Sequence, residues 1–525
     1  MSTLSGVITI TKQTAKSAAN NLFTRFAANF PEDLSQPLLT TPDGTTYTYA
    51  DALDESGRVA RCLSDLGLKA GDRVTVQVEK SPMVVWLYLG CLRGGFVFHP
   101  LNMDYQAEEL EYFIGNAKPA AIVCDPAKLD IHTRLAAETD CRVLTLAAND
   151  AGTLVTAMRE MPPDFQTRER KLSDIAVLLY SSGTTGPPKG AKITHANLAA
   201  NATTLVRAWG FTAADTLLHT LPVYHAHGLF VGLGCVLMSG ASMQFLPRFS
   251  AAAVCTALPV STVMMGVPTY YSRLLSEAGF DAALCAHMRL FICGSAPLPE
   301  TLLQAFHERS GHLILERYGM TETGMNASNP LTGERRPGTV GPALPGVELR
   351  VTDEADQPLP AGTVGHLQVR GPNVFAGYWR TGNAARNDFT ADGFFRTGDL
   401  AAIAADGYVT IAGRSRDLII TGGLNVYPRE LENVLDSLPE VVESAVIGVP
   451  HDDFGEAVVA VVVASGGRAA LRTEELLDTL RPRLAGYKLP KQVVVVDALP
   501  RNSMGKVQKN RLREQYAGLF STPPA

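Results

Sequence analysis

The sequence of 525 residues predicts an α/β fold in which helices cover parallel β-sheets, followed by a small antiparallel part and an α+β tail. Short apolar runs alternate with amphipathic helical stretches through most of the chain, which is typical of parallel sheets. From Val347, short strand-like runs are separated by Gly, Asp and Pro turns, which indicates antiparallel strands. After Arg414, helical and strand-like segments occur together. The chain is too long for one hydrophobic core, so several domains are expected.

The first part contains five expected strands and two well-marked helices. The strands are residues 73–78, 120–124, 175–179, 262–265 and 289–293. The helices are residues 194–209, with Thr194 as the N-cap, and 300–309. In such folds, ligands bind at the carboxyl ends of the parallel strands. Three loops of small residues follow strand ends, at residues 181–183, 266–268 and 294–297.

The later elements are shorter. The antiparallel part has expected strands at residues 347–351, 365–369, 394–396 and 408–411. The tail has expected helices at residues 428–437 and 473–484 and strands at 441–449 and 457–463. The uncharged stretch 228–247 approaches bilayer length, but it holds four glycines. We therefore interpret it as a helix and a strand buried in a large core.

Composition excludes several classes of protein. Charged residues make up 19% and the formal net charge is −6 without a basic tract, which argues against a nucleic-acid binder. The eight cysteines form no Cys-x-x-Cys pair, so we expect free thiols in a reducing, cytoplasmic location. Residues 1–31 carry basic but no acidic residues, as transit peptides do, although a plain N-terminal extension is the favoured interpretation.

The most informative motif is the loop from Tyr180 to Gly190. An apolar strand precedes it, a helix is expected after it, and it contains glycines, hydroxyl side chains and Lys189. Backbone N–H groups near glycine, hydroxyl donors and a lysine charge all suit phosphate. The loop lacks the Walker A spacing, because two prolines precede Lys189. The motif therefore predicts a phosphate site of another kind.

Four further motifs follow along the chain, at residues 316–323, 397–400, 413–423 and 500–506. Glu322 in the first motif can hold Mg²⁺, which binds few protein carboxylates and otherwise phosphate and water. Asp399 in the second can accept both hydroxyls of a ribose. Taken alone, Glu322 is better explained as part of a solvated turn, Asp399 as part of a common Gly-Asp turn, and Lys506 as a solvated lysine in a basic tail.

Together, the order and spacing of the five motifs resemble the adenylate-forming superfamily of acyl-CoA synthetases, adenylation domains and luciferases, from Asn21 to Tyr516. The resemblance implies a large N-terminal domain of two doubly wound sheets plus a small β-barrel, at residues 21–415. It also implies a mobile α+β C-terminal domain at residues 416–525, with a hinge at Arg416. Residues 1–20 would be an extension.

The resemblance also implies roles for individual residues. The β- and γ-phosphates of ATP would be held by Ser181, Ser182, Gly183, Thr184, Thr185, Gly186 and Lys189. The adenine would be lined by Gly294, Ser295, Ala296, Pro297, Glu316, Arg317 and Tyr318, with Gly319 and Met320 continuing the nucleotide-binding segment. Thr321 would contact the α-phosphate, Glu322 would bind Mg²⁺, and Asp399 and Arg414 would bind the ribose. Lys506 would assist adenylation, and Gly423 would admit the thiol of CoA.

The acid pocket is expected beside His225, Ala226 and His227, with His227 as a gating and catalytic residue and Met320 as a further wall. Three stretches, at residues 267–274, 288–298 and 316–330, resemble the malonyl-CoA synthetase branch of the superfamily. A dicarboxylate needs a cation for its distal carboxylate, best an arginine. Arg273 is the first candidate, with Arg248 and Arg289 as rivals. Ala226 is smaller than the threonine common in relatives, so methylmalonate is expected to fit as well.

The resulting expectation is ATP- and Mg²⁺-dependent ligation of malonate to CoA, with AMP and pyrophosphate as co-products and no nucleic-acid or membrane partner. Three alternatives remain open: a synthetase for another short or aromatic acid, an adenylation module that loads a carrier protein, and a nucleotide-binding sensor. Lys506 is also a candidate for reversible acetylation by a lysine acetyltransferase and deacetylase, because acetylation removes its charge.

Overall fold

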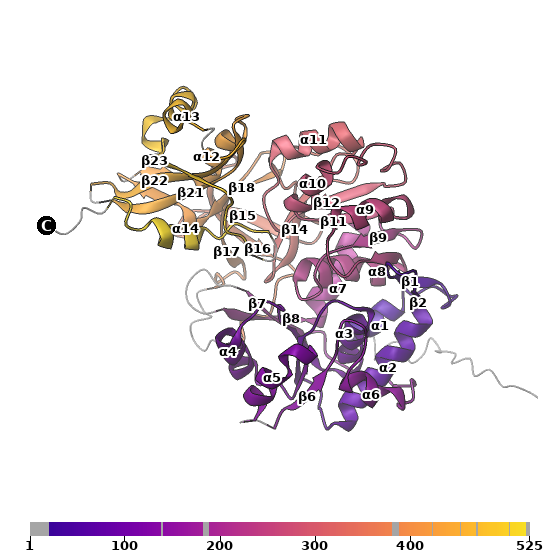
Figure 1. Cartoon of the computed structure of the whole chain (residues 1–525). Helices are drawn as coiled ribbons and strands as arrows, with labels where there is room; N and C mark the ends of the chain where they lie inside the picture. Colours follow the sequence, from indigo (N-terminus) through magenta and orange to yellow (C-terminus); the bar gives the residue numbers. More distant parts are fainter. Residues whose placement is uncertain are drawn as a thin grey trace, which may run out of the picture. The chain divides into compact units, whose positions relative to one another are not determined.

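The computed structural model describes residues 20–137, 140–181, 188–380, 388–422, 424–451, 453–468, 471–502 and 505–520. They form two compact units (Figure 1). The first unit consists of the described parts of Met1–Met265, Met320–Gly324 and Pro372–Arg386. The second consists of the described parts of Gly266–Gly319, Met325–Gly371 and Asn387–Ala525.

A six-stranded sheet organises one half of the first unit, in the order β6-β5-β3-β4-β7-β8. Its strands are β3 (Arg73–Gln77), β4 (Val97–Pro100), β5 (Ala121–Cys124), β6 (Arg142–Thr145), β7 (Ile175–Ser181) and β8 (Lys189–Thr194). All pairs are parallel except β7 with β8. Because parallel crossovers are right-handed, α3 (Pro82–Gly94) covers one face, whereas α4 (Ala107–Ala117) and α5 (Leu129–Ala136) cover the other (Figure 1). The predicted doubly wound sheet is confirmed.

A second parallel sheet in the same unit has the strand order β11-β9-β10-β1, with β2 antiparallel at its edge. Its strands are β1 (Pro37–Thr40), β2 (Thr46–Thr48), β9 (Thr216–His219), β10 (Ser242–Phe245) and β11 (Val263–Gly266). The helices of this unit are α1 (Leu22–Ala27), α2 (Tyr49–Asp65), α6 (Thr153–Arg159), α7 (His195–Ala208), α8 (Leu233–Ser239) and α9 (Ala251–Ala257). Helix α1 packs on α3, α7 and α8, which places a helical layer beside both sheets.

Two local predictions are confirmed here. Thr194 is the N-cap of α7 and forms a capping box with Asn197, so the helix begins where the sequence indicated. The uncharged stretch 228–247 forms a π-helical turn (His227–Gly232), α8 and β10, all largely buried. Among the described residues, no helix is long and apolar enough to span a membrane.

The second unit begins with α10 (Pro268–Leu275), β12 (Leu290–Cys293), α11 (Glu300–Ser310), β13 (Leu315–Met320) and β14 (Gly324–Ser328). Strands β12 and β13 pair in parallel. An antiparallel sheet follows, in the order β15 (Glu348–Thr352), β16 (Gly365–Arg370), β17 (Phe395–Ile403) and β18 (Val409–Arg414).

The predicted small β-barrel is wrong, because in the described part of the chain these four strands form an open sheet with β15 and β18 at its two edges. The sheet contributes Val351, Leu367 and Val409 to a hydrophobic cluster that also includes Ala327 and Val340.

The tail has a sheet of order β20-β19-β22-β21, with β23 parallel to β22. Its strands are β19 (Ile419–Thr421), β20 (Leu424–Val426), β21 (Val441–His451), β22 (Gly455–Ala464) and β23 (Gln492–Val496). Its helices are α12 (Pro428–Asp436), α13 (Thr473–Leu480) and α14 (Lys509–Tyr516). One hydrophobic cluster holds α12 and α13 and another holds α14. Both clusters take residues from β21 and β22, which explains why those strands are almost continuously apolar.

Candidate active site

The strands on either side of the predicted phosphate loop, β7 and β8, pair antiparallel in the first unit. Ser181 at the end of β7 pairs with Lys189 at the start of β8. The prediction of a strand, a loop and then a helix is therefore wrong in one respect, because α7 begins only after β8. Pro188 directly precedes Lys189, and proline, which has no N–H to donate, is tolerated at the start of an edge strand such as β8. The predicted phosphate ligands Ser182, Gly183, Thr184, Thr185 and Gly186 lie outside the described residues.

The structure brings Glu322 to this hairpin. The hydroxyls of Ser181 and Tyr378 donate to Glu322 Oε1 at 2.6 Å and 2.9 Å. The carboxylate is 4% exposed, and the Lys189 ammonium lies 4.9 Å from the centre of the Tyr378 ring. A carboxylate held through one oxygen can offer the other to Mg²⁺, which takes few protein ligands when phosphate is present. The residues present thus fit the predicted metal.

The predicted ribose pair is preformed in the second unit. Asp399 on β17 and Arg414 on β18 are register partners, and Arg414 Nε lies 2.7 Å from Asp399 Oδ1. The Tyr318 hydroxyl donates to Asp399 Oδ2, and the Asp399 N–H donates to Thr397 Oγ1 at 3.0 Å. Burial and the charge of Asp399 raise the pKa of Tyr318 well above its usual value, so Tyr318 stays a hydrogen-bond donor.

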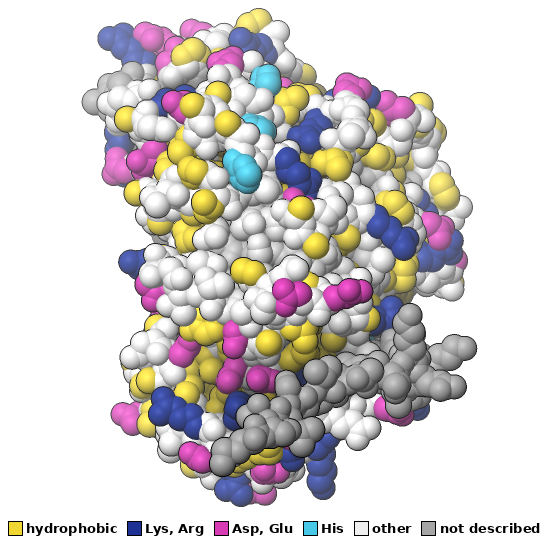
Figure 2. Space-filling view, turned by 90° about the vertical axis from the view of Figure 1, so that its right-hand side faces the viewer, with side chains coloured by type: hydrophobic (Ala, Val, Ile, Leu, Met, Phe, Trp, Pro, Cys, Tyr) yellow, Lys and Arg dark blue, Asp and Glu magenta, His cyan; other side chains and the backbone are white. Residues whose placement is uncertain are grey.

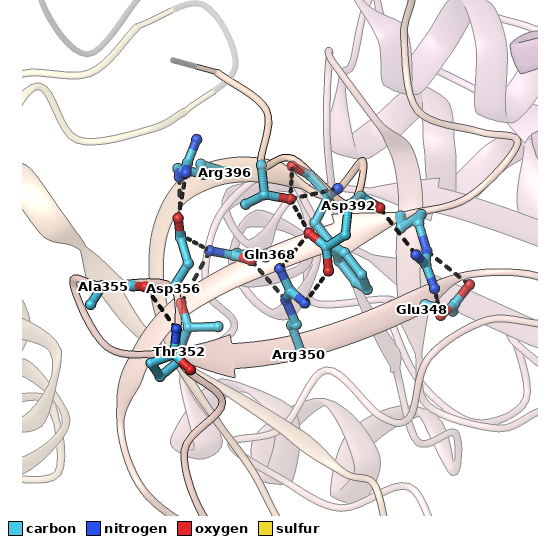
Figure 3. A network of polar contacts seen from close by, with 12 residues as sticks. Glu348, Arg350, Thr352, Ala355, Asp356, Gln368, Asp392 and Arg396 are labelled. Carbon is cyan, nitrogen blue, oxygen red and sulfur yellow. Dashed lines mark hydrogen bonds and ion pairs between the residues drawn. The ribbon is translucent and has the colours of Figure 1, made fainter. Parts of the chain in front are cut away.

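A polar network at one end of the antiparallel sheet fixes β17 (Figure 3). Arg350 donates to both oxygens of Asp392 at 2.6 Å and 3.0 Å and to Gln368 Oε1 at 2.8 Å. Gln368 and Arg396 both donate to Asp356. These links join β15, β16 and β17 through charge-assisted hydrogen bonds, the stronger kind. They hold the strand that presents Asp399.

The predicted adenine loop follows β12. Gly294, Ser295, Ala296 and Pro297 form the turn before α11, and Ser295 has a φ of 69°. The Leu298 N–H donates to Glu316 Oε1 at 3.1 Å, which ties this turn to β13. Burial raises the pKa of Glu316 to about 7. Gly319 and Met320 end β13, and Thr321 follows them.

Lys506 lies close enough to the ribose pair to interact with its charges. Desolvation and the like charges of Arg414 and Arg416 lower the pKa of Lys506, and Asp399 opposes them. Part of its side chain stays exposed. The Lys506 N–H donates to Asn502 Oδ1 at 2.9 Å. Arg501 donates to the Gly505 carbonyl and to Glu443, so β21 anchors this loop.

The predicted acid-pocket wall belongs to the first unit. Ala226 and His227 are 4% and 1% exposed, and His227 begins the π-helical turn. A side chain on Gly228 would meet the Pro222 carbonyl at 2.2 Å, so only glycine fits there. The described residues contain no group of three or more His, Cys, Asp or Glu able to hold a metal, so the His225–His227 pair has no additional ligand of these types.

Sequence reasoning missed a buried pair behind this wall. Lys80 donates to His219 Nδ1 and to the His219 carbonyl, both at 2.8 Å. His219 Nε2 lies 2.9 Å from the Gly228 carbonyl, so Nε2 carries the hydrogen and donates. Burial lowers the pKa of His219 to about 3 and that of Lys80 well below its usual value. The only available signal was a lysine two residues after the predicted strand 73–78.

The arginines predicted to bind the acid lie in different surroundings. Arg273 on α10 is exposed, Arg248 is exposed, and Arg289 is partly buried. Arg317, which was predicted to line the adenine, is 3% exposed. Gly423 lies outside the described residues.

The first unit holds the predicted phosphate hairpin and the carboxylate predicted to bind Mg²⁺, and the second unit holds the predicted ribose pair. These are the groups expected of an enzyme that activates an acid with ATP. The model of the AMP-binding enzyme family matches residues 23–379, and that of the AMP-binding enzyme C-terminal domain matches residues 430–506. The chain belongs to the AMP-binding enzyme family.

Individual relatives span nearly the whole chain. The mitochondrial malonate–CoA ligase ACSF3 of Mus musculus is 38% identical over 89% of this chain and 87% of its own length. A feruloyl-CoA synthase of an Amycolatopsis species is 34% identical over 90% and 94%. The crystal structure of ATP-bound MatB from Rhodopseudomonas palustris is 48% identical, covers 96% of this chain and 100% of that chain, and has a TM-score of 0.94.

Proposed function

We propose that this protein joins malonate to CoA through a malonyl-adenylate, consumes ATP and releases AMP and pyrophosphate. The observation that carries the proposal is the electrostatic interaction of the Lys506 ammonium with Asp399 and Arg414, the predicted ribose pair. The ammonium would then lie near the α-phosphate of a nucleotide whose ribose this pair binds. Malonate as the acid is supported by the malonate–CoA ligase among the relatives.

In the first half-reaction, a malonate oxygen attacks the α-phosphorus and pyrophosphate leaves. Two anions must approach each other, so the barrier depends on positive charge and donors around the phosphorus. Lys506 would supply a charge there, and Lys189 and Ser181 would face the departing phosphates. Glu322 would hold Mg²⁺, which screens phosphate charge when bound. Asp399 and Arg414 fix the ribose.

In the second half-reaction, the CoA thiol attacks the acyl carbonyl and AMP leaves. We propose that the C-terminal domain, residues 416–525, turns about Arg416 between the two steps. Gly423 would then line the path of the thiol. A hinged domain can present different groups to one site in turn, which two successive reactions require.

An acid panel with ATP, Mg²⁺ and CoA tests the substrate. Malonate should be preferred, methylmalonate accepted because Ala226 is small, and succinate, acetate, benzoate and ferulate should be poor. A preference for benzoate or ferulate would favour the aromatic-acid alternative, which the feruloyl-CoA synthase relative keeps open. Acyl transfer to a carrier protein but not to CoA would favour an adenylation module instead.

We further propose a cytoplasmic location and control by acetylation of Lys506. Free cysteines, most of them buried, suit a reducing compartment. The partly exposed ammonium of Lys506 is accessible to a modifying enzyme. Chemical acetylation of Lys506 alone should abolish adenylation. Full activity of such a preparation would exclude regulation by acetylation at this position.

A further inference from the structure

A buried lysine joins the two sheets of the first unit. Lys80 comes three residues after β3 of the six-stranded sheet and is 8% exposed. Its ammonium donates to Nδ1 and to the carbonyl oxygen of His219, both at 2.8 Å. His219 ends β9 of the other sheet, 139 residues further along the chain. The two bonds therefore tie together the carboxyl ends of one strand from each sheet.

The ammonium of Lys80 has a third contact, with an aromatic ring. It lies 4.3 Å from the centre of the Phe245 ring, whose face attracts a cation. Phe245 ends β10 and is the register partner of His219. A buried polar group costs free energy unless it is hydrogen-bonded, so these contacts keep a lysine stable at this position. Because an apolar residue would avoid that cost, the lysine indicates a task for its donors.

The contact with Lys80 fixes the tautomer of His219. The Gly228 carbonyl can only accept a hydrogen bond, so His219 Nε2, 2.9 Å away, carries the ring hydrogen. Burial lowers the pKa of His219 to about 3, so the ring is neutral at neutral pH and Nδ1 holds a lone pair. Lys80 donates to that lone pair. The opposite tautomer would turn a lone pair toward the Gly228 carbonyl and an N–H toward the ammonium.

The far end of this chain of hydrogen bonds is the wall of the predicted acid pocket. Gly228 belongs to the π-helical turn His227–Gly232. Its carbonyl accepts from His219 and from the Leu233 N–H, which is the i→i+5 bond of a π-helix. Single π-helical turns occur frequently at functional sites. The imidazole of His219 therefore supports this turn from outside the helix.

The last residue of the turn is shaped to the same imidazole. A Cβ built on Gly232 would lie 3.1 Å from Cδ2 and 3.2 Å from Nε2 of His219. A side chain at position 232 would therefore push the ring away from the turn. At the other end, Gly228 lies against the Pro222 carbonyl, which a Cβ would meet at 2.2 Å. The turn is thus held between the Pro222 carbonyl and a ring that Lys80 keeps in place.

We propose that Lys80 is a positioning residue, which acts through His219 to fix the π-helical turn and so the fit of the acid against Ala226 and His227. The proposal rests on the function proposed above. Ala226 and His227 are 4% and 1% exposed, so a shift of the turn would change the pocket wall itself. A misplacement of about 1 Å far from the reacting atoms can cost about a hundredfold in rate.

The test removes the donors of Lys80 and keeps the length of its side chain. Lys80→Met should lower kcat/KM for malonate roughly 10- to 100-fold, mainly through a higher KM for malonate, with the KM for ATP nearly unchanged. Lys128→Met is the matched control. Lys128 also follows a strand of the six-stranded sheet, and its ammonium donates to the Tyr105 carbonyl at 3.3 Å. This control should leave the KM for malonate and for ATP as in the wild type.

A double-mutant cycle tests whether Lys80 acts through His219. His219→Phe should reproduce the loss on malonate, and it serves if Lys80→Met does not fold. The double variant should lose no more than His219→Phe alone, because both changes break the same chain of hydrogen bonds. His219→Gln keeps an N–H for the Gly228 carbonyl and should recover much of the loss. Nitrogen NMR of labelled histidine should show one His219 tautomer in the wild type and both in Lys80→Met.

The outcomes separate the role of Lys80 from the proposed function. A wild type that uses malonate, with an unchanged KM for malonate in Lys80→Met or His219→Phe, overturns the positioning role and leaves the function intact. A double variant whose loss is the product of the two single losses also overturns it, as do equal rises in the KM for malonate and for ATP. A wild type that prefers another acid overturns the proposed substrate, and the same variants are then compared on that acid.

Discussion

At the scale of single residues, charge placement decides the chemistry. The carboxylate of Asp399 is held by Arg414 and Tyr318, so its two oxygens are oriented before a nucleotide binds. Lys506 sits on a loop that Arg501 anchors to Glu443. Preorganised groups of this kind lower a barrier more than mobile ones, because they need not reorganise during the reaction.

Lys506→Ala should lower the adenylation rate by at least about a hundredfold, because an ammonium that screens charge at phosphorus is lost. The variant should still form malonyl-CoA from preformed malonyl-adenylate and CoA. Pyrophosphate release measures the first step, and thioester absorbance measures the second. Equal losses in both steps would show that Lys506 does not act on adenylation alone.

Glu316→Gln should alter how stability depends on pH. The folded-state pKa of Glu316 is raised to about 7 from 4.5, so the folded protein holds an extra proton between these values. Its contribution to stability is therefore fully present below about pH 4.5 and declines as the pH rises to about 7. The wild type should lose roughly 1–3 kcal/mol more than the variant over this window. Parallel Tm profiles of the two proteins from pH 5 to 8 would contradict the shift.

The order and spacing of the five motifs in the sequence identified most residues of the candidate site. Ser181, Glu322, Asp399 and Arg414 lie in the polar contacts described above, while their roles in catalysis stay predictions. The motifs could not identify the pair of Lys80 and His219. That pair depends on a contact between distant segments, which no local pattern encodes.

At the scale of elements, strand alternation gives β13 two faces. Glu316 and Tyr318 lie on the face predicted to meet the nucleotide, and Arg317 lies on the other. The antiparallel sheet has a related division, since its polar network holds β17 at one end while β17 presents Asp399 (Figure 3).

Arg350→Met should destabilise this sheet by about 1 kcal/mol, because a bidentate, partly buried ion pair is lost. The KM for ATP should rise modestly as β17 loosens. Arg370→Met is the matched control, since its pair with Glu348 is more exposed and should matter less. A larger Tm loss for Arg370→Met than for Arg350→Met would contradict this ranking.

The sequence predicted strands correctly where buried apolar runs were clear. It did not predict strand β8 or how the antiparallel strands are arranged. The expected strands near β3, β5, β7, β11 and β12 are confirmed, because buried parallel strands are continuous apolar runs. Strand β8 was missed because its residues, from Lys189 to Thr194, mix polar and apolar types without a clear period. The barrel was wrong because a resemblance does not fix how four strands close.

At the scale of the whole molecule, two compact units share one chain that passes between them several times. The face in Figure 2 mixes acidic and basic side chains among the described residues, without a broad field of one sign. A surface of this kind suits small-molecule substrates better than nucleic acid. The boundaries of the N-terminal domain, residues 21–415, and of the C-terminal domain, residues 416–525, stay predictions.

Gly423→Leu should block thioester formation while adenylation survives, because a leucine side chain would occupy the path of the thiol. Pyrophosphate release without CoA should match that of the wild type. Malonyl-CoA formation should fall below a tenth of the wild-type rate, a loss of about 1.4 kcal/mol or more. Unchanged turnover with CoA would place the thiol path elsewhere.

The most direct test of the central claim is the product balance of one reaction with malonate, ATP, Mg²⁺ and CoA, measured by ion-exchange chromatography. Activation through a malonyl-adenylate predicts malonyl-CoA, AMP and pyrophosphate in equal amounts, and malonyl hydroxamate when hydroxylamine replaces CoA. ADP and phosphate in place of AMP and pyrophosphate would contradict it.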